Sequence, residues 1–207
     1  MKTFDLTYPF DRDIPVFPGD SYPQWRQVAT IASEGYNSVQ LRTGMHVGTH
    51  MDAPLHMIED GQPLSAYPPD FFIGPGLLIN AEGASLVGEE YLHSVDLDGV
   101  AMVLVYTGWG VHFRHPRYFE EYPELSTGFA RRLVNAGIRI VGLDFPSPDR
   151  APYEVHRILL GNGVLIVENL MDLGVLLPYP TFEVIALPAR YEADGAPVRV
   201  VARVMEP

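Results

Sequence analysis

The 207-residue chain contains no cysteine. Disulfides, thiolate catalysis and cysteine-ligated zinc or iron–sulfur sites are therefore excluded, so any bound metal must be held by nitrogen and oxygen ligands. Basic residues are also scarce, because 14 Lys and Arg stand against 26 Asp and Glu and give a formal charge of −12. This balance disfavours binding to nucleic acid or to an anionic membrane, and it favours a small-molecule substrate.

Long hydrophobic runs are absent as well. The longest, residues 100–106, is far shorter than the roughly 20 residues that cross a bilayer. The N-terminal segment lacks the apolar core of a signal peptide. Apolar residues make up 47% of the chain and charged residues 19%, which is typical of an ordered globular protein. We therefore expect a soluble, cytoplasmic protein.

Short β-type runs recur along the whole chain. They cover residues 24–31, 37–43, 76–80, 100–107, 139–144, 163–168, 182–187 and 197–205. One helix is predicted over 126–136, with Ser126 as N-cap and Gly137 just past its end. A second is predicted to start near Pro152 and to stop at residues 161–163. Each helix leads into a strand, and no repeat or linker marks a boundary. The pattern predicts one α/β domain spanning residues 1–207, with a mixed central sheet and an irregular, surface-exposed N-terminal half.

Histidines are concentrated in one short segment. His46, His50 and His56 fall within eleven positions, with Asp52 among them. Imidazole and carboxylate together form a ligand set for Zn²⁺, or for Mn²⁺ where oxygen ligands dominate. The alternative interpretation is a group of surface histidines beside a turn aspartate. Because the density of these residue types is high, we prefer the metal site.

This segment must bend if its side chains are to share a metal. Gly48 and Pro54 argue against a helix. A straight strand would hold His46 and Asp52 roughly 20 Å apart, whereas zinc ligands lie about 2.0–2.2 Å from the metal. Gly48 and Pro54 are also the residues that could bend the chain.

The pattern His-x-Gly-Thr-His-x-Asp-x-Pro-x-His at residues 46–56 resembles the signature of the metal-dependent cyclase-like hydrolases, a family that includes bacterial kynurenine formamidase and isatin hydrolase. The resemblance extends over nearly the whole chain. Its further matches are Asp5-Leu6 with Pro9, Pro15 and Pro18-Gly19-Asp20, then Thr107-Gly108-Trp109, Gly142-Leu143-Asp144 with Ser147 and Asp149, and His156 with Glu168-Asn169-Leu170.

The resemblance implies a swivelling β/β/α-type fold and a centre of two divalent metal ions per chain, most often zinc. The nitrogen and oxygen ligands leave manganese as the alternative. It gives His56 the role of catalytic acid or base. The metal ligands that it implies are His46, His50, Asp52, His156 and Glu168.

Two of these ligands can also be argued from the residues themselves. His156 lies on the predicted helix after Pro152, and Glu168 ends an apolar run in which an unpaired carboxylate would be costly. Taken alone, each has an ordinary alternative: a hydrogen-bonded helix histidine and a solvated charge at a strand end. Five protein ligands exceed what one tetrahedral zinc needs. Two metals about 3.5–4 Å apart, with Asp52 as a candidate bridge, fit this number better.

We therefore expect a metal-dependent hydrolase that cleaves a carbon–nitrogen amide bond with a metal-activated hydroxide. The simplest form is an arylformamidase acting on an N-formylkynurenine-like substrate, with His56 protonating the leaving nitrogen. A lactam or cyclic-imide hydrolase, like isatin hydrolase, is one alternative, and a noncatalytic metal-binding scaffold is another. The many strands and aromatic residues favour a homodimer or homotetramer, which would cover sheet edges and apolar patches.

Three further sets of residues have an expected place or role. An aromatic pocket could be lined by Phe17, Trp25, Trp109 and Phe145, although aromatic residues near turns more often pack in a core or an interface. Ligand imidazoles could be oriented by Asp144 and Asp149, although the segment around Asp149 also fits an ordinary turn before a helix. The surface is the expected place of His93, His112 and His115.

Overall fold

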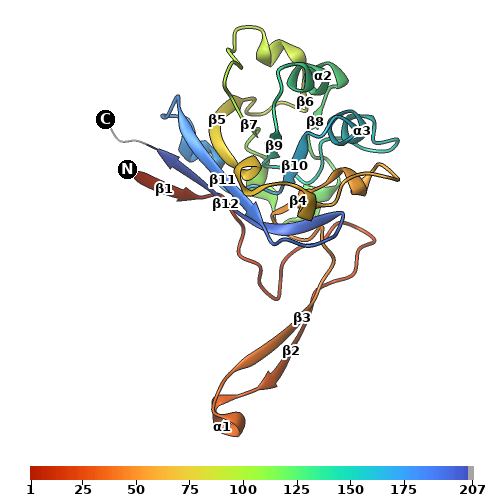
Figure 1. Cartoon of the computed structure of the whole chain (residues 1–207), viewed down its shortest axis with the longest axis vertical. Coiled ribbons are helices and arrows are strands. Elements are labelled where there is room, and N and C mark those ends of the chain that lie inside the picture. The colour runs from red at the N-terminus through yellow and green to blue at the C-terminus, as the bar shows by residue number, and fades with distance from the viewer. Residues whose placement is uncertain (205–207) are drawn as a thin grey trace.

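One mixed sheet closes on itself in the computed structural model, which describes residues 1–204 (Figure 1). The eight strands follow the order β1-β12-β11-β5-β7-β9-β10-β4, and β12 also pairs with β4. That second pairing makes a closed ring, to which β1 adds as an outer strand on β12. The strands are β1 (Lys2–Asp5), β4 (His50–Asp52), β5 (Ile73–Asn80), β7 (Met102–Tyr106), β9 (Ile140–Leu143), β10 (Leu165–Glu168), β11 (Phe182–Pro188) and β12 (Gly195–Val204).

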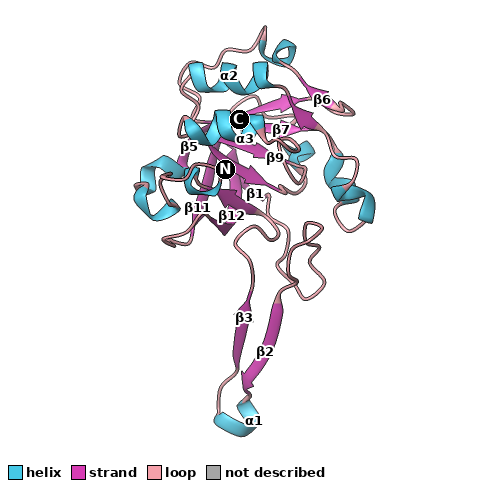
Figure 2. Cartoon of the chain, turned by 90° about the vertical axis from the view of Figure 1, so that its right-hand side faces the viewer, coloured by secondary structure: helices cyan, strands magenta, loops and turns pink. Residues whose placement is uncertain are grey.

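Two helices cover the outer face of the parallel part of this sheet. α2 (Thr127–Asn135) and α3 (Glu154–Gly161) pack against β7, β9 and β10, whose apolar runs are buried on both faces, as is usual for parallel strands (Figure 2). The alternation along β7 shows the two sides. Met102 and Leu104 belong to the core inside the ring, and Val103 and Val105 belong to the core under the helices.

A long hairpin projects away from this body (Figures 1 and 2). It consists of β2 (Gln24–Ala29) and β3 (Ser38–Arg42), which form a sheet of their own, with the one-turn helix α1 (Ile31–Glu34) at the tip. A second small sheet pairs β6 (Leu86–Val87) with β8 (Glu124–Leu125). The remaining elements are the 3₁₀ helices η1 (Pro54–His56), η2 (Leu64–Ala66), η3 (Pro69–Phe72), η4 (Glu89–Leu92), η5 (Trp109–His112), η6 (Pro116–Phe119) and η7 (Leu173–Leu176).

The expected α/β fold with a mixed central sheet is confirmed. Each predicted β-run overlaps a strand, and the helix predicted over 126–136 is α2, with Ser126 as its N-cap. The second helix begins at Glu154, two residues after Pro152, because Tyr153 just before it has a φ of 61°, which lies outside the helical region. Met205, the last residue of the final predicted strand, lies outside the described residues, as does the end of the predicted 1–207 domain.

The prediction of an irregular, surface-exposed N-terminal half is wrong in two respects. β1 joins the main sheet, and β4 completes the ring by pairing with both β10 and β12. Leu6 and Ile14 are buried. These strands have four and three residues, which is too short to produce a periodic hydrophobic pattern. Within residues 1–204, no helix has the length and hydrophobicity needed to cross a bilayer.

Candidate metal centre

The register between β4 and β10 brings three expected ligands to one face of the sheet. Asp52 lies opposite Ile166, and His50 lies opposite Glu168. Residues two apart on a strand point to the same side, and Ile166 faces the core beneath the helices. His50, Asp52 and Glu168 therefore point toward α3. All three are at least 90% buried.

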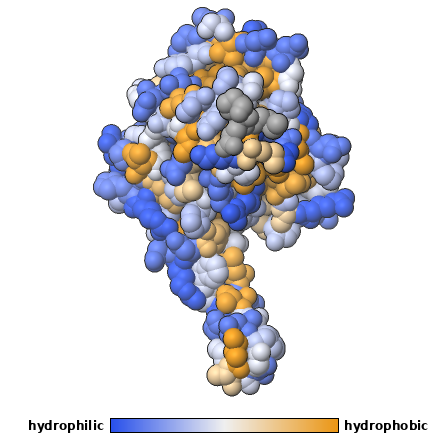
Figure 3. All heavy atoms as spheres, turned by 90° about the vertical axis from the view of Figure 1, so that its left-hand side faces the viewer, coloured by the Kyte–Doolittle hydropathy of each residue, from blue (hydrophilic) through white to orange (hydrophobic). Residues whose placement is uncertain are grey.

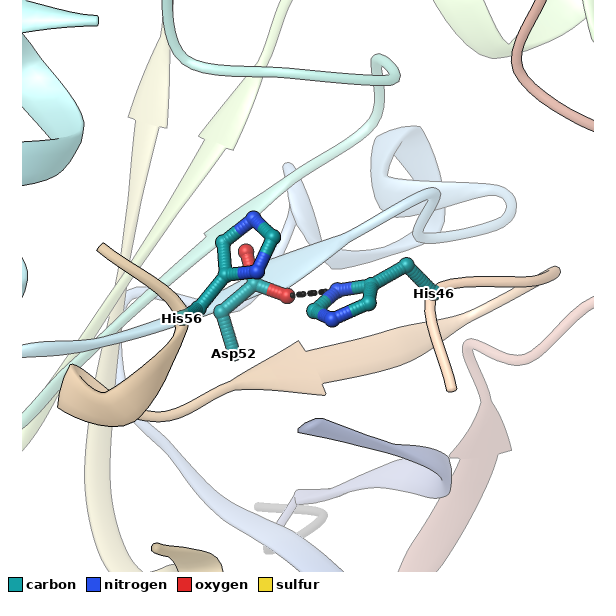
Figure 4. Close-up of side chains that lie close together, drawn as sticks. All are labelled: His46, Asp52 and His56. Atoms are coloured by element: carbon teal, nitrogen blue, oxygen red, sulfur yellow. Dashed lines mark hydrogen bonds and ion pairs between the residues drawn. The ribbon is translucent and has the colours of Figure 1, made fainter. Parts of the chain in front are cut away.

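A sharp bend brings His46 back onto the same site. Gly48 has a φ of 69°, a left-handed conformation that favours glycine. A Cβ atom at this position would also lie 2.6 Å from Cδ1 of Ile14. On the other side of β4, Pro54 begins η1, and this turn directs His56 toward Asp52 (Figure 4). The predicted bend at Gly48 and Pro54 is confirmed.

Asp52 lies at the centre of the resulting cluster. Its Oδ1 atom is 2.7 Å from Nδ1 of His46 and 3.3 Å from Nε2 of His50. The Nε2 atom of His50 is also 3.3 Å from Oε2 of Glu168. Potential ligand atoms lie within 4.8 Å of one another in two groups, which share Asp52: one with His46 and His56, the other with His50 and Glu168.

The ligand atoms around His50 are arranged as they would be around a cation. Nδ1 of His50 is 2.9 Å from the Gly48 carbonyl oxygen, which can only accept, so Nδ1 carries the hydrogen. Among the described residues, Nε2 is buried without a hydrogen-bond partner, although it faces the two carboxylates. A neutral Nε2 would direct its lone pair at negative oxygens. A cation placed between these atoms would be bound by the lone pair of the imidazole nitrogen and by the carboxylate oxygens together.

The buried groups also shift each other's pKa values. Burial acts to lower the pKa of His50, but the charges and hydrogen bonds of Asp52 and Glu168 outweigh it and raise that pKa well above its ordinary value. Burial acts to raise the pKa of Asp52, but His50 and His46 hold it well below the ordinary value. The pocket therefore favours ionised carboxylates beside positive charge, which suits a bound cation.

His156 approaches the site from the buried face of α3. Its Nδ1 donates to Asp149, and its Nε2 is 3.5 Å from Oε1 of Glu168. It belongs to neither of the two tight groups, but it faces the second oxygen of Glu168. Burial acts to lower the pKa of His156, whereas its bonds to Asp149 and Glu168 raise it to about 10.

Of the two aspartates expected to orient imidazoles, only Asp149 does so. It accepts from His156, and its second oxygen accepts from the backbone N–H of Val155 at the start of α3, so it also serves the expected turn. Asp144 instead accepts from the backbone and hydroxyl of Thr107 and from the backbone of Gly108. It ties the end of β9 to the end of β7.

A cavity of about 310 Å³ opens over the cluster, which is within the range of small-molecule sites. Of the four aromatic residues expected to line it, only Phe17 does. Trp25 lies on the hairpin, Trp109 donates its Nε1 hydrogen to the Tyr118 carbonyl, and Phe145 is fully buried in the core under the helices. Aromatic walls that the sequence did not indicate come from Phe113, Phe119 and Tyr153.

The three histidines expected at the surface lie outside the site. His93 and His115 are exposed, and His112 is half-buried against Trp109, so none of the three joins the site.

Sequence reasoning missed Asp194, whose Oδ2 atom is 2.9 Å from Nε2 of His46. Only the pairing of β12 with β4 brings Asp194 there, and no local pattern signals that pairing.

The chain is similar to known proteins both in sequence and in structure. A family model described as "Putative cyclase" matches residues 4–150. A kynurenine formamidase of Geobacillus thermodenitrificans is 34% identical, with 97% of each chain covered, and one of Bacillus cereus is 33% identical, covering 98% of this chain and 99% of the relative. Isatin hydrolase A from Labrenzia aggregata, solved with benzyl benzoate, superposes with a TM-score of 0.87 at 25% identity, covering 99% of this chain and 94% of that one. A structure of a potential metal-dependent hydrolase with cyclase activity gives 0.83 at 26% identity, covering 100% and 99%.

Proposed function

The chain belongs to the cyclase family and is a hydrolytic enzyme, and on this basis we propose that it is an arylformamidase, which removes the formyl group from an N-formylkynurenine-like amide. The observation that carries the proposal is the pair of ligand groups that share Asp52 at the base of an aromatic cavity. The relatives named kynurenine formamidase cover almost the whole chain and support the choice of substrate.

The site suits a divalent metal, and we propose two ions, zinc or alternatively manganese. Asp52 is the shared ligand, because it is the only member common to both groups found among the described residues. When bound, such ions supply Lewis acidity, which lowers the pKa of water and polarises a carbonyl oxygen. The residues that would hold them are His46, His50, Asp52, His156 and Glu168.

His56 is the proposed proton carrier. Its ring lies beside that of His46, with centroids 4.1 Å apart, and it lines the cavity at 27% side-chain exposure. Burial lowers the pKa of His56, and Asp52 opposes this only in part. An imidazole placed between cavity and cluster can accept a proton from water and return it to the leaving nitrogen of the amide. The alternative is that His56 completes the ligand group of His46 and Asp52.

The cavity walls explain why the amide would carry an aryl group. Phe17 and Phe119 meet edge to face, with ring centroids 5.6 Å apart, and Phe113 adds a third ring. Such rings favour offset or edge contacts with another aromatic ring. The same walls also suit a fused bicyclic lactam, and the structural similarity to isatin hydrolase A makes a cyclic-imide or lactam hydrolase the second candidate.

A substrate panel tests the proposed activity. We expect the zinc-loaded protein to hydrolyse N-formylkynurenine or N-formylaniline with a kcat/KM at least about tenfold above that for isatin or a cyclic imide, a barrier difference of about 1.4 kcal/mol. Chelation followed by dialysis should abolish turnover, and added zinc should restore it. A preference for isatin would favour the second candidate. If none of these compounds is hydrolysed, both proposed substrate classes are wrong.

We propose further that the protein assembles at least as a dimer, with a second copy packing on the projecting hairpin. A two-stranded hairpin alone is marginally stable in water, and Figure 3 shows hydrophobic side chains along this one. Val28, Ile31, Tyr36, Val39 and Leu41 on it are each at least 42% exposed. A second copy would cover this surface.

Light scattering should therefore give at least twice the mass of the chain, which is 23.0 kDa, at micromolar concentration. Replacing both Ile31 and Val39 with aspartate should shift the assembly toward monomer, because two charges would enter the apolar contact. The matched control is Leu187→Asp, at an exposed position on β11. A wild-type protein that is purely monomeric, or an assembly that the double variant leaves unchanged, would contradict this arrangement.

A further inference from the structure

Asp194 lies at the edge of the cluster, in the segment between β11 and β12. Its backbone carbonyl accepts a 2.8 Å hydrogen bond from the N–H of Ala53, and the next residue, Gly195, pairs with Asp52 across β12 and β4. The backbone of Asp194 is therefore fixed relative to β4. Its side chain remains 42% exposed, so its contribution to the folded core is small.

One carboxylate oxygen of Asp194 faces two imidazoles. Oδ2 is 2.9 Å from Nε2 of His46 and 3.5 Å from Nδ1 of His56. On the opposite side of its ring, Nδ1 of His46 is 2.7 Å from Oδ1 of Asp52. A hydrogen on Nε2 of His46, donated to Asp194, leaves Nδ1 as the nitrogen presented to the cluster.

Gly195 closes around the same ring. A Cβ atom built on Gly195 would lie 2.8 Å from Cε1 of His46 and 2.9 Å from the carbonyl oxygen of Met51. The backbone of β12 thus lies directly against the imidazole, and no larger residue leaves room for it. Asp194 and Gly195 together form a cradle for His46, from adjacent positions at the start of one strand.

We propose that Asp194 is a positioning residue, which holds His46 with Nδ1 toward the metal site. The carboxylate oxygen that accepts from His46 also faces His56. This inference rests on the proposed metal-binding role of His46 and proton-carrying role of His56. Carboxylates that receive the second N–H of a metal-binding histidine fix its orientation and raise its basicity, and their loss typically costs 10–100-fold in metal affinity or activity.

The test compares Asp194→Ala and Asp194→Asn with the matched control Glu192→Ala, an exposed acidic residue of the same segment. Zinc affinity is measured by competition with a chromogenic chelator, thermal unfolding is measured without metal, and kcat and KM are measured with zinc. We expect Asp194→Ala to weaken zinc binding about 10–100-fold and to lower kcat more than it raises KM. Asp194→Asn should lose less, because its amide oxygen can still accept from Nε2–H of His46.

A second variant addresses the cradle. Gly195→Ala places a methyl group against the imidazole, and we expect it to weaken zinc binding at least as much as Asp194→Asn does. Wild-type zinc affinity in Asp194→Ala would overturn the inference, as would a loss of affinity that merely follows a lower unfolding temperature of the metal-free protein. If the wild-type protein binds no zinc, the proposed metal site fails instead, so the two failures can be told apart.

Discussion

Asp52→Ala should lose bound metal and activity together. Asp52 is 1% exposed and is common to both ligand groups, so its removal leaves the imidazoles of His46 and His50 without their shared anion. Metal affinity should fall by more than the 10–100-fold typical of residues that only orient a ligand. Thermal stability in zinc-containing buffer should also fall, because a ligand at 100 times its Kd stabilises the folded state by about 2.7 kcal/mol.

The matched control is Asp60→Ala, which removes an exposed carboxylate shortly after η1. It should keep wild-type metal content, stability in zinc and turnover. Elemental analysis, thermal unfolding with and without zinc, and amide hydrolysis measure the three properties. An Asp52→Ala protein that retains its metal and its activity would remove Asp52 from the centre of the site.

His56→Ala should behave differently, with normal metal content and a large loss of rate. Its imidazole lines the cavity beside His46, where it can exchange a proton with the reacting amide. General acid–base groups contribute typically 10²–10⁴-fold, so we expect kcat to fall by about that factor. The unfolding temperature in zinc should stay close to that of the wild type, because the side chain is only partly buried.

His93→Ala is the matched control for His56, because it removes an exposed imidazole that belongs to neither ligand group. It should leave kcat, KM and metal content unchanged. If His56→Ala loses metal as completely as Asp52→Ala, then His56 is the third ligand of the group with His46 and Asp52. If His56→Ala keeps full activity, another group delivers the proton to the leaving nitrogen.

The sequence predicted the local part of this site because one short segment carries it. His46, His50, Asp52 and His56 lie within eleven residues, and Gly48 supplies the bend that collects them. The same holds for the parallel strands and for α2, whose apolar runs and N-cap are local signals. Where local propensity and final structure agree, a pattern over a few residues is sufficient.

The rest of the site depends on contacts between residues that are distant in the sequence. Asp194 reaches His46 only because β12 pairs with β4, a contact across more than 140 residues. Phe113 and Phe119 line the cavity from irregular segments around η5 and η6, which have no periodic pattern. Phe145 looked equally suitable in sequence, yet packing beneath the helices takes it into the core. Tertiary packing decides which aromatic side chains line the cavity and which are buried in the core.

Elemental analysis of the wild type, His56→Ala and Asp52→Ala decides whether this chain holds two metal ions around Asp52. We expect close to two ions per chain in the wild type and in His56→Ala, and a marked loss in Asp52→Ala. Turnover of the wild type should fall in proportion to the metal that a chelator removes. A wild-type protein that contains no metal, and that hydrolyses the amide equally well after chelation and dialysis, would rule out a metal-dependent hydrolase.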